Sequence, residues 1–154
     1  MIPEEKLSEL KEMEKIYPDK KSLLLPYLQA VQDEYGYISD EAIEYIAKEL
    51  SLNPSFILGV LTFYTYFSRK KRGKYHIQVC RNLSCSLLGA ENLIDYISKR
   101  LSLKPGETSE DGRFTFSLVE CLGCCEKAPV MMINNDYYTE LTVEMVDKIL
   151  SSLR

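Results

Sequence analysis

All five cysteines of this 154-residue chain lie after residue 79, in two tight groups. The first group is Cys80 and Cys85, and the second is Cys121, Cys124 and Cys125. Because the number of thiols is odd, they cannot all pair as disulfides within one chain. In a reducing compartment, clustered cysteines bind metal or carry out redox chemistry more often than they form structural disulfides. The fold therefore has to bring together two thiol groups that are separated by 35 residues.

The composition excludes several classes of protein. Apolar residues make up 45% of the chain and charged residues 27%, which is too apolar for a disordered protein. With 19 basic and 23 acidic side chains the net charge is −4, which argues against binding to nucleic-acid phosphates. No apolar run approaches the roughly 20 residues of a membrane span, and the acidic N-terminal segment lacks the pattern of a secretory signal. We therefore expect a cytoplasmic protein without nucleic-acid binding and without direct membrane insertion.

In the first half of the chain, apolar residues repeat at the three- and four-residue spacing of amphipathic helices. Helices are expected over roughly Glu4–Ile16 and Leu24–Tyr35, and two more begin at the N-cap residues Ser39 and Asn53. This half contains no cysteine, no histidine and no cluster of convergent polar residues. Residues 1–72 are therefore predicted to form an N-terminal helical bundle of about four helices that serves as a docking module.

Two segments at the end of this half allow more than one interpretation. The segment 62–67 holds four aromatic residues, which either bury the seam between the two halves or contact a partner protein. The segment 69–74 is strongly basic and resembles a nucleic-acid patch, but the acidity of the remaining chain favours a solvated linker.

Beyond residue 73 the pattern changes to the alternation of apolar and polar residues that is typical of strands. The expected order is strand, helix, three strands and helix. The strands begin near Tyr75, Phe114, Pro129 and Tyr137, and the helices near Ala90 and Thr142. The first strand–helix–strand unit is expected to be a right-handed parallel crossover, and the later strands a hairpin. Residues 73–154 are therefore predicted to form an α/β domain that resembles the thioredoxin-like fold.

Both cysteine groups are expected on loops that follow strands, where four thiolates can converge on a metal. Cys80 and Cys85 have the Cys-x4-Cys spacing that begins plant-type 2Fe–2S sites. Cys121 and Cys124 have the Cys-x2-Cys spacing of zinc and dithiol redox sites, whereas Cys121 and Cys125 have Cys-x3-Cys spacing. Spacing alone leaves a 2Fe–2S cluster, a zinc site and a thiol redox site open. The single histidine, His76, excludes a Rieske centre, which needs two, and is expected to be a structural or surface residue.

The residues around the cysteines carry a more specific signal. The first group stands in Cys80-Arg-Asn-Leu-Ser-Cys85-Ser-Leu-Leu-Gly89, and the second in Glu120-Cys121-Leu-Gly-Cys-Cys125-Glu-Lys-Ala-Pro129. In this order they resemble the family of the small iron–sulfur (E) subunits of bacterial NADH dehydrogenase (complex I), whose members are thioredoxin-like 2Fe–2S ferredoxins. Related subunits occur in NAD-linked and electron-bifurcating hydrogenases and in formate dehydrogenases. Further matching segments are 28–37, 59–64, 104–114 and 135–138, so the resemblance covers nearly the whole chain.

The resemblance implies one 2Fe–2S cluster held by Cys80, Cys85, Cys121 and Cys125, with Cys124 as an additional thiol. It implies no catalytic residue and no substrate site on this chain. The cluster would exchange single electrons with the FMN of a larger iron–sulfur partner subunit that binds NADH and FMN. The chain would then be an electron-transfer subunit of a multi-subunit NADH dehydrogenase of the NADH:quinone oxidoreductase type. It would be cytoplasmic, and peripheral to the inner membrane through its partners.

Other functions stay open at this point. The main alternative is the equivalent subunit of an NAD-dependent or electron-bifurcating hydrogenase or of a formate dehydrogenase. Two further interpretations are a zinc-stapled adaptor and a thiol oxidoreductase that uses Cys121 and Cys124. The terminal electron acceptor and the self-association of the isolated chain are not determined by these motifs.

Overall fold

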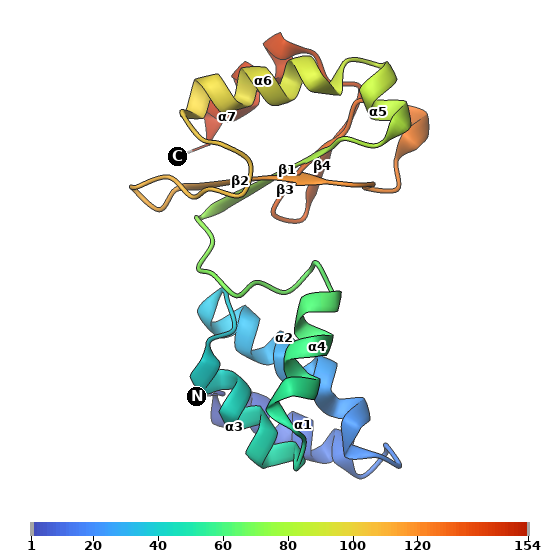
Figure 1. Ribbon diagram of the computed structural model, residues 1–154, viewed down its shortest axis with the longest axis vertical. Coiled ribbons are helices and arrows are strands. Elements are labelled where there is room, and N and C mark those ends of the chain that lie inside the picture. Colours follow the sequence, from blue (N-terminus) through green and yellow to red (C-terminus); the bar gives the residue numbers. More distant parts are fainter. Residues whose placement is uncertain (1, 154) are drawn as a thin grey trace. The chain divides into compact units, whose positions relative to one another are not determined.

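The computed structural model describes residues 2–153, which form seven α-helices, two short 3₁₀ helices and one four-stranded sheet. The chain divides into two compact units, Met1–Lys71 and Arg72–Arg154. Within the described residues, unit 1 is built from helices and unit 2 contains the sheet (Figure 1). None of the helices in residues 2–153 combines the length and the apolar character of a membrane span.

The helices of unit 1 begin at residues that the sequence predicts, and α1 ends at Glu14, two residues before the predicted Ile16. Its elements are α1 (Glu4–Glu14), the 3₁₀ helix η1 (Lys20–Leu23), α2 (Leu24–Tyr35), α3 (Asp40–Leu50) and α4 (Pro54–Phe63). The Ser39 side chain accepts a hydrogen bond from the Ala42 N–H at the start of α3, and Asn53 accepts one from the Ser55 N–H in α4. Gly36 ends α2 in the left-handed conformation. Only η1 has no counterpart among the predicted elements of this unit.

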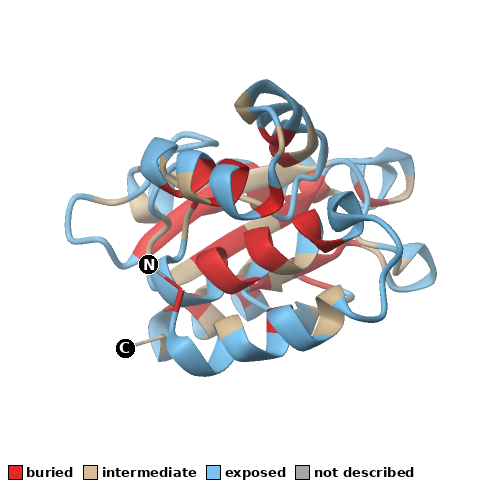
Figure 2. Cartoon of the chain, turned by 90° about the horizontal axis from the view of Figure 1, so that it is seen from below, coloured by how far each residue is buried: buried red, intermediate tan, exposed pale blue. Residues whose placement is uncertain are grey.

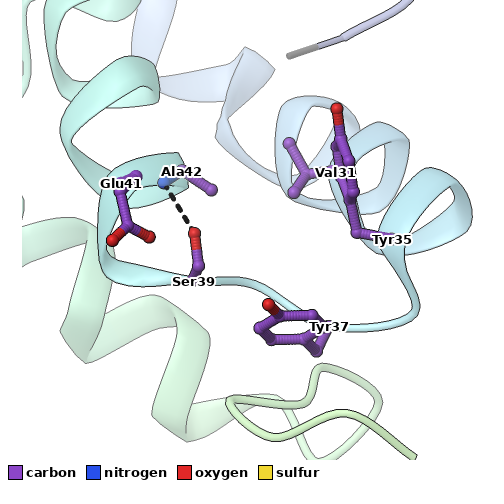
Figure 3. Close-up of a pocket in the computed structure, with 6 residues that line it drawn as sticks. All are labelled: Val31, Tyr35, Tyr37, Ser39, Glu41 and Ala42. Atoms are coloured by element: carbon purple, nitrogen blue, oxygen red, sulfur yellow. Dashed lines mark hydrogen bonds between the residues drawn. The ribbon is translucent and has the colours of Figure 1, made fainter.

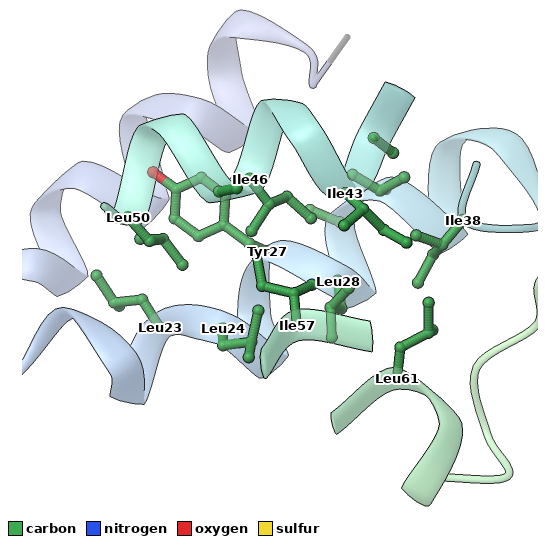
Figure 4. Packing of buried hydrophobic residues seen from close by; sticks show 14 of the residues in the cluster. Leu23, Leu24, Tyr27, Leu28, Ile38, Ile43, Ile46, Leu50, Ile57 and Leu61 are labelled. Carbon is green, nitrogen blue, oxygen red and sulfur yellow. The ribbon is translucent and has the colours of Figure 1, made fainter. Parts of the chain in front are cut away.

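The core of unit 1 lies where the apolar faces of its helices meet (Figure 4). Leu28, Ile46 and Ile57 are fully buried, and Tyr27 lies among them. In Figure 2 the buried positions run as stripes along the helices, with exposed positions on their outer sides. Each fully buried aliphatic side chain contributes about 1.5–3 kcal/mol of transfer free energy. Unit 1 therefore has an apolar core of its own, in which no cysteine takes part.

The segment that follows α4 is fastened to α2. The Gln32 side-chain amide donates to the Tyr66 carbonyl oxygen at 2.8 Å, and its carbonyl oxygen accepts from the Ser68 N–H at 2.7 Å. Phe67 packs against the core of unit 1, whereas Phe63 at the end of α4 is 77% exposed. The aromatic segment 62–67 is therefore partly internal to unit 1 and partly on its surface.

Unit 2 is an α/β fold with both types of strand pairing. Its elements are β1 (Tyr75–Cys80), α5 (Leu83–Leu87), α6 (Ala90–Leu101), β2 (Phe114–Val119), the 3₁₀ helix η2 (Cys125–Lys127), β3 (Met131–Ile133), β4 (Asp136–Tyr138) and α7 (Val143–Ser152). The strand order in the sheet is β2-β1-β3-β4. β1 and β2 pair in parallel, and β3 pairs antiparallel with both β1 and β4. The parallel strand–helix–strand unit and the hairpin are confirmed, whereas α5 and η2 were not predicted.

Helices α6 and α7 cover one face of this sheet (Figure 1). Ile77 and Val79 of β1, Phe116 of β2 and Met131 of β3 are fully buried in the core of this unit. β3 begins at Met131 rather than at the predicted Pro129, because proline has no N–H to donate to a strand ladder. The cysteine-bearing end of β1 lies outside this core, in a small apolar cluster of its own.

His76 is a buried residue of the sheet rather than a surface residue. Side chains alternate along a strand, so His76 points to the face opposite to that of its neighbour Ile77. Its ring nitrogen Nε2 lies 2.9 Å from the Ser117 hydroxyl oxygen. Burial, and to a lesser degree the charge of Arg72, lower the pKa of His76 to about 4.

Gly73 precedes β1, and a Cβ atom at this position would lie 2.8 Å from backbone atoms of Arg113 and Phe114. We expect Gly73→Ala to lower the free energy of unfolding by about 1–3 kcal/mol, because a backbone cannot move aside as a side-chain end can. Gly59→Ala in α4 is the matched control, since a Cβ atom there meets nothing within 4 Å. Alanine is the better helix former by up to about 1 kcal/mol, so this variant should be at least as stable as the parent. Urea unfolding compares the two, and equal stabilities would contradict the close approach at Gly73.

The buried His76 predicts a loss of stability in mild acid. Its pKa is about 4 in the folded chain, against about 6.5 in an unfolded chain. Below pH 6.5 the unfolded state therefore binds more protons, so this part of the stability is complete above pH 6.5 and falls as the pH approaches 4. Between pH 7 and pH 5 we expect a loss of about 1.5 kcal/mol from this group, once solvent screening is allowed for. Urea unfolding of the parent and of His76→Gln at both pH values measures it, and an equal pH dependence of the two proteins would contradict it.

Candidate metal centre

The two cysteine groups meet at the carboxyl edge of the sheet. β1 ends at Cys80, and β2 ends at Val119, two residues before Cys121. Because the two strands are parallel, with Cys80 opposite Val119, their carboxyl ends lie side by side. Helix α5, which follows β1, carries Cys85, and the loop after β2 leads to Cys125 in η2. Thiols that are far apart in the sequence therefore share one edge of the fold.

Hydrogen bonds hold the two cysteine-bearing loops against each other. The Arg81 N–H donates to the Val119 carbonyl oxygen at 2.9 Å, and the Cys80 thiol donates to the Glu120 carbonyl oxygen at 3.4 Å. The Arg81 guanidinium also forms an ion pair with the Glu120 carboxylate at 2.6 Å. Both side chains of this ion pair are largely exposed, so it adds little to stability. The ion pair does neutralise the charges of the two residues next to Cys80 and Cys121.

Each of the two cysteine-bearing loops contains a local turn that a hydrogen bond stabilises. The Asn82 side chain accepts from the Leu83 N–H at 2.8 Å at the start of α5. In the second loop the chain turns at Gly123, whose φ of 80° lies in the left-handed region. At this turn the Gly123 N–H donates to the Cys121 sulfur at 3.4 Å.

Four of the five thiols form two pairs. The Cys121 and Cys125 sulfur atoms are 3.7 Å apart, and Cys80 and Cys85 lie together in one small buried cluster. Burial, followed by the hydrogen bond with Cys80, raises the pKa of Cys85 to about 11. The hydrogen bond with Cys121 and the charge of that thiolate raise the pKa of Cys125. Ionising Cys85 and Cys125 is therefore less favourable unless their thiolates bind a cation.

This arrangement fits a two-iron cluster. Two sulfur ligands of a tetrahedral metal with bonds of about 2.3 Å are about 3.8 Å apart, and the Cys121–Cys125 separation is 3.7 Å. A 2Fe–2S cluster takes two thiolates on each iron, which corresponds to two thiol pairs. Within residues 2–153, no group of three or more His, Cys, Asp or Glu side chains is placed to hold one metal ion.

The two thiol pairs differ in exposure. Cys80 and Cys85 are buried in a small apolar cluster, whereas Cys121 and Cys125 are exposed. The fifth thiol, Cys124, is partly buried against the same apolar cluster. The predicted ligand set therefore combines one pair inside the protein with one pair at its surface.

Unit 1 contains a pocket of about 370 Å³, which no cysteine lines (Figure 3). It is lined by Val31, Tyr35, Tyr37, Ser39, Glu41 and Ala42. The Ser39 hydroxyl already accepts the Ala42 N–H as the cap of α3, and its hydrogen bond lowers the pKa of Glu41. These polar groups stabilise the start of a helix, and the pocket contains no nucleophile paired with a base.

The family model for thioredoxin-like [2Fe-2S] ferredoxins matches residues 10–154 of this chain. The chain belongs to this family. Its cofactor is one 2Fe–2S cluster, which the two thiol pairs fit. The predicted family and the predicted fold class, a helical bundle followed by a thioredoxin-like ferredoxin domain of α/β type, are confirmed.

Curated members of the family are similar over most of their length. NADH-quinone oxidoreductase subunit 2 of Thermus thermophilus is 43% identical over 136 residues, which cover 88% of this chain and 75% of the relative. The second E subunit of the NADH-quinone oxidoreductase of Rhizobium meliloti is 40% identical over 138 residues, with 90% and 82% covered. The E subunit of the NADH-quinone oxidoreductase of Aquifex aeolicus is 38% identical over 150 residues, with 97% and 94% covered.

The fold also occurs inside a longer protein. The crystal structure of an NAD+-reducing [NiFe]-hydrogenase in the air-oxidized state matches with a TM-score of 0.72 and 20% sequence identity. The matching region covers 82% of this chain and 22% of the hydrogenase chain. This ferredoxin fold is thus one part of a larger polypeptide there.

Helix α5 and the 3₁₀ helix η2 are the parts of the site that were not predicted. Asn82 is a favourable N-cap and is the signal that points to α5, but five residues are too few for a helical period to show. The leucines of this helix and of its C-cap, Leu83, Leu87 and Leu88, are exposed.

Proposed function

We propose that this chain is the electron-transfer subunit of a multi-subunit NADH dehydrogenase of the NADH:quinone oxidoreductase type. The observation that carries the proposal is the presence of two thiol pairs at one edge of the sheet, which fit one 2Fe–2S cluster. The relatives at 38–43% identity, which are named as NADH-quinone oxidoreductase subunits, support the same function.

The ligands in this proposal are Cys80, Cys85, Cys121 and Cys125. Four protein thiolates complete the coordination of two irons, so the cofactor supplies one-electron transfer and leaves no position for a substrate. The chain then has no catalytic residue and no substrate site of its own. The Gly123 N–H that points to the Cys121 sulfur stabilises negative charge there, and such hydrogen bonds raise the reduction potential of an iron–sulfur site.

The electrons are exchanged with the FMN of a larger iron–sulfur partner subunit, which binds NADH. In this arrangement residues 1–72 are a docking module and residues 73–154 the ferredoxin domain. Phe56 and Phe63 on α4 support a docking role for the helical part, because they are 46% and 77% exposed and aromatic residues are enriched in interfaces. The partner subunits hold the chain on the cytoplasmic side of the inner membrane.

The second candidate is the equivalent electron-transfer part of an NAD-linked hydrogenase or formate dehydrogenase. The fold similarity to an NAD+-reducing [NiFe]-hydrogenase favours this candidate. The role of the thiol site is the same in both cases, and the difference lies in the terminal electron acceptor. The higher identity to the NADH-quinone oxidoreductase subunits, 38–43% against 20%, favours the first candidate.

Purification of the tagged chain from its native cells tests the function. We expect a red-brown protein with about two irons and two acid-labile sulfides per chain, together with a flavoprotein that contains FMN and oxidises NADH. A colourless protein with stoichiometric zinc would instead support an adaptor. A metal-free protein with a redox-active dithiol would support a thiol oxidoreductase. Recovery of a nickel-containing chain with the flavoprotein would assign the complex to the hydrogenases.

Substitution of the two neighbouring cysteines tests the ligand assignment. We expect Cys125→Ala to lose most of its 2Fe–2S absorbance and iron, because its sulfur is the one that lies 3.7 Å from Cys121. Cys124→Ala is the matched control and should keep both, because the Cys124 side chain packs against the apolar cluster. The reverse outcome, with cluster loss only in Cys124→Ala, would make the assignment of Cys125 wrong.

A further inference from the structure

Three leucines stand exposed beside the thiol site. Leu83 and Leu87 belong to α5, and Leu88 is its C-cap residue. Their exposed fractions are 70%, 76% and 61%. We call these three side chains the α5 leucine surface. Leu83 and Leu87 are four residues apart, so they lie on the same side of the helix.

The core of unit 2 does not account for these leucines. The buried residues under α5 are the small cluster of Cys80, Cys85, Ala90 and Val130. Together, three leucines at this exposure offer an apolar area on the order of a few hundred Å², the size that is typical of an interaction site on a monomer. The folded chain by itself gains nothing from keeping this area in water.

The α5 leucine surface is continuous with the thiol site. Cys85 lies between Leu83 and Leu87 in the same helix and is buried. The loop that carries the exposed pair packs against the same apolar cluster as Cys85, through Leu122 and Cys124. A protein that covers the leucines is therefore brought directly to the thiols.

The charge pattern around the surface selects the kind of partner. Helix α5 contains no charged residue, and Arg81 and Glu120 of the two adjoining loops are paired with each other. The leucines themselves therefore favour an apolar patch on the partner over a strongly charged electron carrier that docks by electrostatic attraction.

The size of the surface also selects the partner. A stable interface buries about 800 Å² on each side, more than three leucines supply, so this surface alone does not hold a second copy of the chain. Redox partners form contacts at the small end of the size range, below about 1,200 Å² in total. These two size limits fit a partner that also contacts this chain at another surface and that has to reach the thiol site.

We propose that the α5 leucine surface is the contact through which the flavin-bearing partner chain docks at the cluster site. This inference rests on the proposed function, in which such a partner exchanges electrons with the cluster. The partner presents an apolar, uncharged patch to Leu83, Leu87 and Leu88. Docking removes these side chains and the neighbouring exposed thiols from water.

The test compares tagged full-length chains purified from the native cells. The double variant Leu83→Gln with Leu87→Gln should recover at least tenfold less FMN-containing partner per chain than the parent, with unchanged 2Fe–2S absorbance. Tyr137→Gln is the matched control, because Tyr137 on β4 is another exposed apolar side chain of the same unit, with 52% of its surface exposed. This control should recover the partner as the parent does.

The outcomes separate the two proposals. A double variant that keeps both its cluster and its full complement of FMN-containing partner would overturn the docking proposal and leave the proposed function intact. A parent chain that recovers no flavoprotein would refute the proposed function itself.

If the double variant loses its cluster, a second measurement tests the docking proposal. Replacement of Leu87 alone by a photo-crosslinking phenylalanine derivative should yield a crosslink to the FMN-containing chain. The same replacement at Tyr137 should yield none. A crosslink from position 87 only to a second copy of this chain, or no crosslink, would overturn the docking proposal.

Discussion

The parallel pairing of β1 with β2 is the constraint on which the site depends. Because Cys80 lies opposite Val119, the loops that leave the two strands begin next to each other and carry both thiol groups to one edge. An antiparallel pairing of the same six-residue strands would separate the groups by about 20 Å, at a rise of about 3.3 Å per residue. The crossover helix α6 maintains this pairing through Ile94 and Ile97, which are buried in the core of unit 2.

The core and the site of unit 2 are built from different residues, and their stabilities have different origins. The core is apolar and contains no cysteine. Burial and the neighbouring Cys80 raise the pKa of Cys85, and the neighbouring Cys121 raises that of Cys125, so the thiolate forms of Cys85 and Cys125 are favoured by a bound metal. Binding of the cluster and ordering of the two loops are therefore linked. The exposed pair and the α5 leucine surface stand on the side from which a partner would approach, whereas the buried pair is shielded by the protein itself.

Unit 1 shows how much of the fold follows from local sequence. The caps at Ser39 and Asn53 begin the helices where the hydrophobic period predicts them, and Thr142 does the same for α7 in unit 2. Strand pairing was predictable as well, since a strand–helix–strand unit favours parallel neighbours. The elements that escaped prediction, η1, α5 and η2, span only three to five residues each. In such short elements, capping and tertiary contacts matter more than any hydrophobic periodicity of the sequence.

The sequence by itself predicted a set of iron ligands and identified the family to which the chain belongs, because cysteine spacing and flanking residues are local properties. It left the choice between Cys124 and Cys125 dependent on the resemblance. Only the tertiary structure decided that the Cys125 sulfur lies 3.7 Å from that of Cys121 and that His76 is buried. It also decided that three leucines beside the site remain uncovered. The physical reason is that a hydrophobic pattern shows which side chains are apolar, whereas strand order and loop geometry decide what packs against them.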